Sequence, residues 1–267
     1  MKGSKPLLEY EDRWVTEMGA WFPGERVVYR GKDLFHELKD QRWMALFLYG
    51  ITGRQFTEKQ IRLFEGIWCL STSYPEPRLW NNRVAALAGT ARSTGALGVS
   101  AATAVSEATT YGQRPIIRAF DFLLRMQQEL DSGASLVRLI EQELRRFRAI
   151  PGYGRPGVRT DERIEPLMSL ARGLGFVHGR YLKLAFDIED LLLRGRWRMH
   201  MNVAALAAAL LADQGLTPRE YYHYSILSFS AGIVLSFLDT SSKSEGCFFP
   251  LRCDRVQYCG KPRRIWN

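Results

Sequence analysis

The sequence predicts an all-α fold. Helical periodicity runs through most of the chain, whereas strand signals are confined to residues 25–29 and, more weakly, 255–258. Clusters of Pro and Gly separate the periodic segments, as is typical of helices joined by tight turns. With 267 residues, 46% of them apolar, the chain is long enough to bury a sizeable core. We therefore expect helices packed on helices, in one large or two smaller domains.

The first strong helical pattern covers residues 57–70, whose apolar side chains recur on one face. Thr57 followed by Gln60 predicts a capping box, in which each side chain accepts a hydrogen bond from an otherwise unpaired backbone N–H. Residues 84–109 are rich in Ala, Gly, Ser and Thr. Because small side chains let neighbouring backbones approach closely, we expect this segment to be a deeply packed helix.

Six further helices are expected downstream. They cover residues 116–130, 135–149, 162–175, 177–194, 201–213 and 218 to about 238. A loop rich in Pro and Gly at 151–157 separates the second of these from the third. The clearest helix start is at 217–220, Thr-Pro-Arg-Glu, which combines an N-cap, Pro at the first helical position and Glu at the third.

The net charge of +9 is carried mostly by arginine. Such a balance favours polyanionic partners, namely nucleic acid, a membrane surface or a phosphate-rich cofactor, and scattered solvated faces explain it equally well. No helix-turn-helix, RNP or zinc signature accompanies the charge, so no nucleic-acid partner is expected. The longest apolar runs, 203–212 and 225–238, are shorter than a membrane span and predict buried helices, so no membrane partner is expected either.

The chain is expected to be cytoplasmic, because residues 1–12 lack the apolar core of a secretory signal. Its four cysteines should then stay reduced. Cys247, Cys253 and Cys259 are evenly spaced, but the spacing matches no common zinc pattern. We therefore predict small buried cysteines and no metal site.

The most informative motif is the loop at residues 150–156, Ile-Pro-Gly-Tyr-Gly-Arg-Pro, followed by Asp-Glu-Arg at 161–163. It resembles the acyl-CoA and catalytic loop of citrate synthases, where the pattern runs Ile/Val-Pro-Gly-Phe/Tyr-Gly-His and then Asp-Pro-Arg. Other stretches resemble the citrate synthase superfamily, and especially its short citryl-CoA-lyase-like branch, in the same order. These stretches are residues 28–34, 45–57, 82–87, 202–203, 215–218 and 255–260.

The resemblance, which spans roughly residues 25–262, implies an all-α homodimer with two helical domains. The large domain would comprise residues 1–112 and 203–267, and a smaller domain, 113–202, would be inserted into it. The active site would lie in the cleft between them and would be built in part by the partner subunit. The implied substrates are an acyl-CoA, or CoA itself, and a small carboxylic acid.

The same resemblance implies several ligand-binding residues. Arg163 matches the arginine that grips the substrate carboxylate, although a helix-surface Arg paired with Glu162 or Glu165 is an equal alternative. The further substrate-binding candidates are Asn202 and Arg255, and the acyl-CoA would meet the loop residues Pro151, Gly152, Tyr153 and Gly154. A plain helix-to-helix turn is the alternative for the loop. Several arginines near it suit the phosphates of CoA, namely Arg145, Arg146, Arg148, Arg155 and Arg159, and a solvated helix face explains the first three as well.

The side chains that perform the family's chemistry are replaced. The loop His position is Arg155, and the catalytic Asp position is Ala204. The family's two earlier histidines would fall near Ser73 and within 100–111, but no His lies between residues 37 and 177. The substrate arginine of the late helix corresponds to Phe229, and the partner subunit's arginine falls near Cys253. Losing a base and an enolate donor together costs several orders of magnitude in rate, since each contributes ~10²–10⁴-fold.

Three residues are candidates for altered chemistry. Arg155 stays protonated and cannot be a base, but it can hold a carboxylate or stabilise an oxyanion. His200 lies two residues before Asn202 and is a candidate displaced base, and Tyr111 is a candidate hydroxyl donor; for both, a structural role is the alternative. The sequence leaves two functions open. One is an enzyme with non-standard C–C bond-forming, cleaving or acyl-transfer chemistry, for which specialised biosynthesis is a plausible setting, and the other is an inactive citrate-synthase-like binding or regulatory protein.

Overall fold

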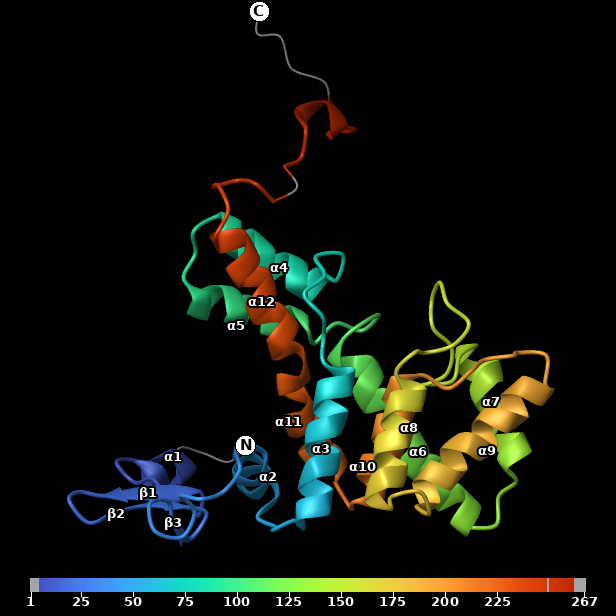
Figure 1. Cartoon of the computed structure of the whole chain (residues 1–267), viewed down its shortest axis with the longest axis horizontal. Coiled ribbons are helices and arrows are strands. Elements are labelled where there is room, and N and C mark those ends of the chain that lie inside the picture. Colours follow the sequence, from blue (N-terminus) through green and yellow to red (C-terminus); the bar gives the residue numbers. More distant parts are fainter. Residues whose placement is uncertain (1–4, 249, 262–267) are drawn as a thin grey trace, which may run out of the picture. The chain divides into compact units, whose positions relative to one another are not determined.

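The computed structural model describes residues 5–248 and 250–261, and they form a mainly helical fold with one small sheet (Figure 1). The elements are α1 (Lys5–Tyr10), β1 (Gly19–Phe22), β2 (Arg26–Tyr29), β3 (Lys32–Asp33), α2 (Trp43–Thr52), α3 (Glu58–Ser71), α4 (Trp80–Thr90), α5 (Gly95–Val105), α6 (Gln113–Asp131), α7 (Leu136–Phe147), α8 (Ile164–Leu174), α9 (Arg180–Arg194), α10 (Val203–Asp213), α11 (Pro218–Ile226), η1 (Leu227–Phe229), α12 (Ser230–Ser241) and η2 (Cys253–Arg255). The predicted all-α class is confirmed.

The chain divides into two compact units, each built from two separate segments. The first comprises Met1–Leu70 and Ile116–Ser225, and the second comprises Ser71–Pro115 and Ile226–Asn267. The expected inserted domain, 113–202, begins where α6 begins and ends just before α10. Its limits as a domain stay a prediction, as does the homodimer.

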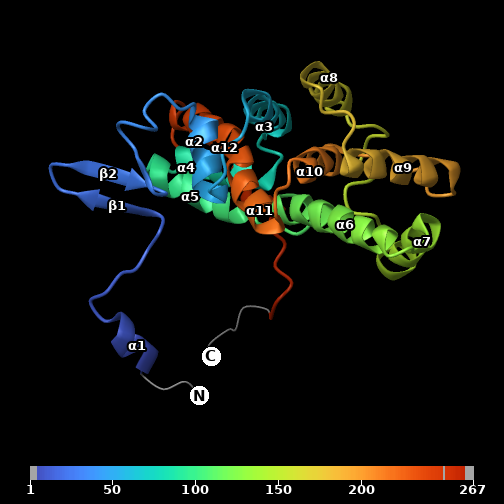
Figure 2. The same cartoon turned by 90° about the horizontal axis from the view of Figure 1, so that it is seen from below.

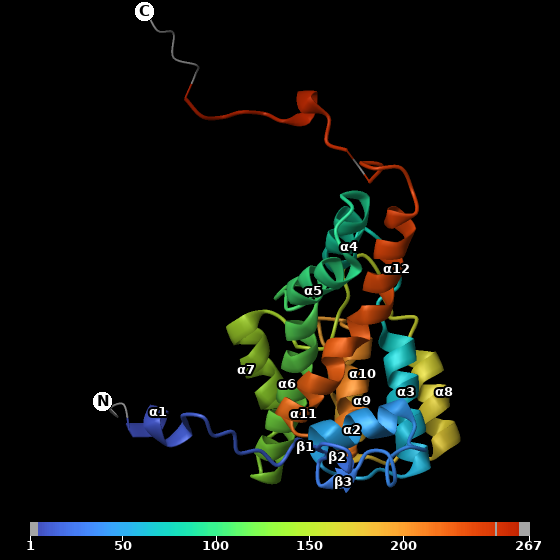
Figure 3. The ribbon, with the colours of Figure 1, turned by 90° about the vertical axis from the view of Figure 1, so that its left-hand side faces the viewer.

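The core of the first unit is centred on α10. Nine of the eleven residues of this Ala- and Leu-rich helix are buried, and α9 packs along it (Figure 3). An aromatic group lies in the same core, where the rings of Phe120 and Tyr221 stack 4.3 Å apart. The buried Tyr224 hydroxyl donates a hydrogen bond of 2.6 Å to the Phe64 carbonyl. Apolar burial of this extent is the main favourable term in folding.

The sheet of the first unit is a three-stranded antiparallel meander in the order β1-β2-β3, whose first hairpin is visible in Figure 2. The predicted strand at 25–29 is confirmed as β2. Strands β1 and β3 were not predicted, because β1 is fully exposed and shows no alternation, and β3 has only two residues. The weaker strand signal at 255–258 is wrong, since η2 and extended chain occupy that region.

In the second unit α4, α5 and α12 pack side by side (Figure 1). The prediction of one helix over 84–109 is wrong, because the chain turns at Arg92, which has a left-handed φ of 58°. Thr94 then starts α5 by accepting a hydrogen bond from the Leu97 backbone. The expected close approach of backbones is confirmed between α4 and α12 at Gly89, where a Cβ would lie 2.6 Å from the Phe237 carbonyl oxygen. Deep packing does not hold for α5, since Leu97 is 66% exposed in this chain.

Both predicted helix starts are confirmed as capping boxes. Gln60 accepts from the Thr57 backbone N–H at 2.9 Å, and Thr57 accepts from the Gln60 backbone N–H at 3.3 Å. The same exchange joins Thr217 and Glu220, at 2.8 and 3.2 Å. These local side-chain signals define helix starts because each one satisfies a backbone N–H that the helix itself leaves unpaired.

Two expectations about exposure need correction. Cys247, Cys253 and Cys259 were predicted to be buried, but all three are exposed, as is Cys69. Within residues 5–248 and 250–261, no group of three or more metal-ligating side chains is present.

The predicted apolar helix 225–238 belongs to a longer helical stretch, Pro218–Ser241, with an 18-residue window of mean hydropathy 1.2 that is 44% buried. By length and composition alone it would reach across a membrane, as many core helices of globular proteins would.

Candidate functional site

The Pro/Gly loop is joined to the segment that leads into α10. The Gly154 N–H donates to the His200 carbonyl at 2.7 Å, and the Asn202 N–H donates to the Gly152 carbonyl at 2.9 Å. Between these two bonds lies an antiparallel bridge between Tyr153 and Met201. The loop therefore has a fixed backbone conformation at the N-terminus of a buried helix.

Gly152 must be a glycine for two separate reasons. Gly152 has a φ of +85°, a conformation that costs any residue with a Cβ. A Cβ at Gly152 would also lie 2.5 Å from the Ala205 Cβ, so the loop backbone rests directly on the first turn of α10. Gly154 has a φ of +80° but meets only the flexible Met199 side chain, at 3.7 Å.

Tyr153 anchors the loop to α9. Its ring is buried, and its hydroxyl donates to the Ala185 carbonyl at 2.7 Å. Burial raises the pKa of Tyr153 well above its usual value, and the nearby Glu189 carboxylate adds to the effect. The phenol is therefore neutral and already engaged, so any acyl-CoA contact at this residue would come from its backbone.

Asn202 ties the loop to the helix through both ends of its amide. Its Oδ1 accepts from the Ala204 N–H at 2.9 Å, which caps α10, and its Nδ2 donates to the Gly154 carbonyl at 2.8 Å. The predicted substrate-binding role of Asn202 stays a prediction, and the contacts present are structural ones.

Asp161 and Arg163 form the most elaborate polar contact of the site. The Asp161 side chain is fully buried, and its two oxygens accept from Arg163 Nε at 2.8 Å and Arg163 Nη2 at 2.7 Å. The same carboxylate accepts from the Val203 N–H at 2.9 Å, at the start of α10. The alternative pairing of Arg163 with Glu162 or Glu165 is wrong, because its partner is Asp161. The substrate-binding role of Arg163 stays a prediction.

The environment of Asp161 keeps it ionised. Burial alone raises the pKa of Asp161, but the hydrogen bonds from the Arg163 side chain and the Val203 backbone outweigh burial and lower this pKa to about 2. The charged carboxylate fixes the Arg163 guanidinium in one orientation. Arg163 remains 26% exposed, and among the described residues its Nη1 group donates no hydrogen bond.

Arg155 approaches the same carboxylate. Its Nη1 lies 3.5 Å from Asp161 Oδ1 and forms an ion pair with the exposed Glu162. Arg155 and Arg163, which we name the arginine pair, thus share one buried carboxylate and are each about a quarter exposed. The two positive charges are matched by Asp161 and Glu162, so the feature that suits a carboxylate or phosphate ligand is the Arg163 Nη1 edge, which Asp161 does not engage.

His200 is held beside Glu189. Its Nδ1 lies 3.4 Å from Glu189 Oε1, and the same oxygen accepts from the Met201 N–H at 2.9 Å. Within the described parts of the chain, the buried His200 Nε2 atom has no hydrogen-bond partner. Because a proton acceptor must reach its substrate, His200 acts as a base only if a ligand or a local movement uncovers this atom.

Two of the predicted site residues lie outside the unit that contains the loop. Tyr111 and Arg255 belong to the second unit. The Tyr111 ring packs edge-on against Trp80 with centroids 5.4 Å apart, and Arg255 lies exposed in η2. The catalytic role of the first and the substrate-binding role of the second stay predictions.

Two positions that would carry a His and an Arg by resemblance are packed together inside the second unit. Ser73 is buried and donates from its Oγ to the Phe229 carbonyl at 2.9 Å. A Cβ at Gly232 would lie 2.3 Å from the Ser73 Oγ, so this side of the contact is also filled. Larger side chains at Ser73 would have no room without a shift of α12.

The comparisons with solved structures agree on the fold. The chain is similar to citryl-CoA lyase from Hydrogenobacter thermophilus, with a TM-score of 0.82, 22% identity and coverage of 95% of this chain and 97% of that one. It is also similar to ATP citrate lyase from Methanothrix soehngenii in complex with citrate and coenzyme A, with a TM-score of 0.77, 18% identity and coverage of 98% of this chain. The chain spans only 45% of that larger protein.

Citrate synthase from Thermoplasma acidophilum, in a ternary complex with carboxymethyl coenzyme A and oxaloacetate, has a TM-score of 0.61 at 17% identity over 85% of this chain and 59% of that one. The sequence matches no protein-family model and no curated protein. The chain therefore has the citrate-synthase-like helical fold, and the likeness to the citryl-CoA-lyase-like branch is confirmed as a likeness of fold.

Proposed function

We propose that this chain, whose fold is that of the citrate synthases, is an enzyme that acts on an acyl-CoA or a carboxylic acid with non-standard chemistry. The observation that carries the proposal is the arginine pair, in which a buried carboxylate orients Arg163 beside a loop fixed on α10. The reaction would form or cleave a C–C bond or transfer an acyl group. The protein would work in the cytoplasm as a homodimer, with CoA or its ester as substrate and without a metal.

The arrangement suits anion binding more than proton abstraction. Asp161 holds Arg163 through Nε and Nη2, so its Nη1 edge remains to take a ligand carboxylate. The similar ATP citrate lyase was solved with citrate and coenzyme A, which supports the same ligand classes here. Ala204 offers no carboxylate at the start of α10, so a standard citrate synthase mechanism has no base at that position.

An inactive binding or regulatory protein is the second candidate. It is favoured by the packed contact between Ser73 and Phe229, which fills the two positions where the resemblance expects a His and an Arg. Both candidates keep an anion site at Arg163, and they differ in whether a bound thioester is turned over.

The first test is thermal unfolding of the purified full chain with CoA, acetyl-CoA, citrate and a panel of other di- and tricarboxylates at physiological salt. A ligand present at a hundredfold excess over its Kd stabilises the folded state by about 2.7 kcal/mol, which raises the Tm by roughly 5–10 °C at this size. Arg163→Lys should abolish most of this shift, because a lysine cannot satisfy Asp161 and a ligand in the same fork geometry. Arg172→Lys, an exposed arginine on α8, is the control and should keep it.

Turnover of whichever thioester binds separates the two candidates. Product formation that falls with Arg163→Lys supports the enzyme. Binding without any turnover supports the binding protein, and a cooperative melt that no CoA compound or acid shifts contradicts both.

A further inference from the structure

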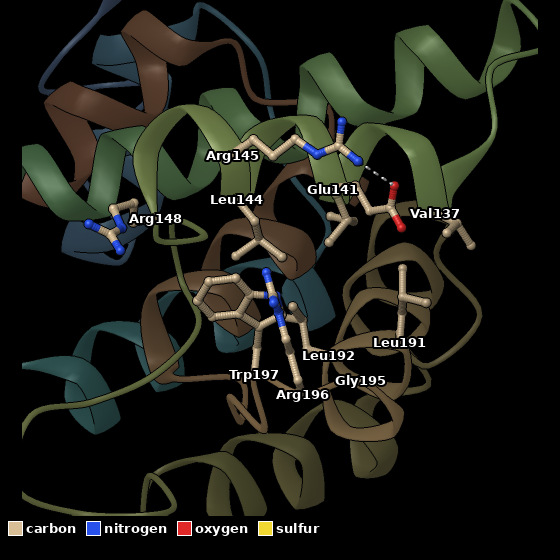
Figure 4. Close-up of a pocket in the computed structure, with 11 residues that line it drawn as sticks. Val137, Glu141, Leu144, Arg145, Arg148, Leu191, Leu192, Gly195, Arg196 and Trp197 are labelled. Atoms are coloured by element: carbon tan, nitrogen blue, oxygen red, sulfur yellow. Dashed lines mark ion pairs between the residues drawn. The ribbon is translucent and has the colours of Figure 1, made fainter.

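A cavity of about 570 Å³ lies between one face of α7 and the C-terminal end of α9 (Figure 4). Its volume is in the range of small-molecule sites, roughly 300–1,000 Å³. All of its lining residues lie in 137–148 and 191–197, within the first unit. It contains none of the residues of the Pro/Gly loop and neither member of the arginine pair.

The floor of this cavity is apolar. Ile140 and Leu144 repeat at four-residue spacing along α7, and Leu192 faces them from α9; all three are buried. Val137 continues the stripe at one end of the cavity, where it is 48% exposed. A ligand that covers Val137 removes apolar surface from water, which is favourable, and it contacts the buried floor at its edge.

The charges around the floor are arranged unequally. Arg148 lies at one end of α7, and Arg196 rises from the α9 side toward Leu144, whereas Glu141 lies at the other end beside Val137 (Figure 4). Among the described residues, neither Arg148 nor Arg196 has a carboxylate within ion-pair distance. The cavity therefore has a cationic end and, at the other end, a single carboxylate among its lining residues.

The remaining arginine of the cavity, Arg145, forms an ion pair with that carboxylate. Arg145 Nη2 lies 3.6 Å from Glu141 Oε2, and both side chains are largely exposed. A pair of this kind contributes little to stability, but it directs the Arg145 guanidinium away from Arg148 along α7 (Figure 4).

An aromatic side chain completes the cationic end. The Arg196 guanidinium carbon lies 4.9 Å from the centre of the Trp197 ring, and the indole is 37% exposed. The cavity thus offers a flat apolar surface directly beside a guanidinium group. Such a surface suits a ring or a flat chain that carries an acidic group.

We propose that this cavity binds an amphipathic organic monocarboxylate, with its apolar body on the floor and its carboxylate between Arg148 and Arg196. At the far end Arg145 is already paired with Glu141, so among the described residues no unpaired guanidinium is available there for a second negative group. A nucleotide fits less well, because its ribose would lie against Leu144 and Leu192, which offer no hydrogen bonds. The site goes beyond the proposed function, since it shares no residue with the arginine pair.

The test is calorimetric titration of the full chain with 3-phenylpropanoate and with 3-phenylpropanamide, which has the same body without the charge. The acid is expected to bind saturably at one site, and the amide at least tenfold more weakly. The double variant Arg148→Gln/Arg196→Gln should lose at least tenfold in affinity for the acid. Arg146→Gln/Arg172→Gln removes the same charge from exposed arginines outside the cavity and should change the affinity less than twofold.

A second variant tests the floor without touching any charge. Val137→Trp places a large side chain at the open end, and it should weaken binding of the acid at least fivefold. The proposal is overturned by any of four results: no saturable binding, equal binding of acid and amide, equal losses in the two double variants, or tighter competitive binding of adenosine 3′,5′-bisphosphate. The last result would assign the cavity to a nucleotide.

Discussion

Asp161→Asn is expected to lower the free energy of unfolding by about 2–4 kcal/mol, because it breaks a buried, multiply hydrogen-bonded ion pair. The Asp161 carboxylate accepts from Arg163 Nε and Nη2 and from the Val203 N–H, and its side chain is fully buried. An asparagine has one acceptor oxygen for these donors, and its NH₂ group would face an N–H. Urea unfolding measures the loss. Glu162→Gln, which removes the same charge from a side chain that is 67% exposed, should cost less than about 0.5 kcal/mol.

The stabilisation by Asp161 should also depend on pH in a defined direction. The pKa of Asp161 is about 2 in the folded chain and about 3.9 in an unfolded one. Since the folded value is the lower one, the contribution is fully present above about pH 5 and is lost as the pH falls toward 2. The shift corresponds to roughly 2–3 kcal/mol at neutral pH. Unfolding of the wild type and Asp161→Asn from pH 5 to pH 2 should therefore show a shrinking difference; a difference that stays constant contradicts the pKa assignment.

Local signals in the sequence predicted the helices well. The capping boxes at Thr57 and Thr217 depend on residues three apart, and a single sequence contains all the information they need. The division of 84–109 into α4 and α5 was missed because Arg92 takes a left-handed conformation that usually belongs to Gly or Asn. Strand β1 was missed because its position depends on pairing with β2, which one strand's pattern does not encode.

Loop geometry and distant contacts together explain what sequence reasoning missed in the site. Arg163 was compared with Glu162 and Glu165, as a helix residue would be, but it lies at the N-cap of α8 and pairs with Asp161 instead. The bond from Val203 to Asp161 joins residues 42 positions apart. Glu189, which lies beside His200 and accepts from Met201, was not predicted at all. Glu189 lies on α9, and nothing in the sequence near His200 indicates that this carboxylate is close to it.

Gly152→Ala is expected to cost about 3 kcal/mol or more, and to disturb the loop that supports the arginine pair. Two separate penalties act at this position. An L-residue at a φ of +85° costs roughly 1–2 kcal/mol, and the new Cβ would lie 2.5 Å from the Ala205 Cβ and 3.0 Å from its Cα. Relief of that contact requires the loop to lift from α10, which would break the bond from the Asn202 N–H to the Gly152 carbonyl. Urea unfolding and the ligand-induced thermal shift would measure the two consequences.

Gly157→Ala separates these penalties, because Gly157 has a similar φ of +78° but a Cβ there would meet no atom within 4 Å. It should cost only about 1–2 kcal/mol, the conformational part, and leave any CoA- or acid-dependent shift unchanged. The difference between the two variants then measures the contact of the loop with α10. Equal losses in stability would mean that the loop does not rest on Ala205 in solution. A ligand shift that survives Gly152→Ala would mean that ligand binding does not depend on the position of this loop, and that Arg163 must bind without its support.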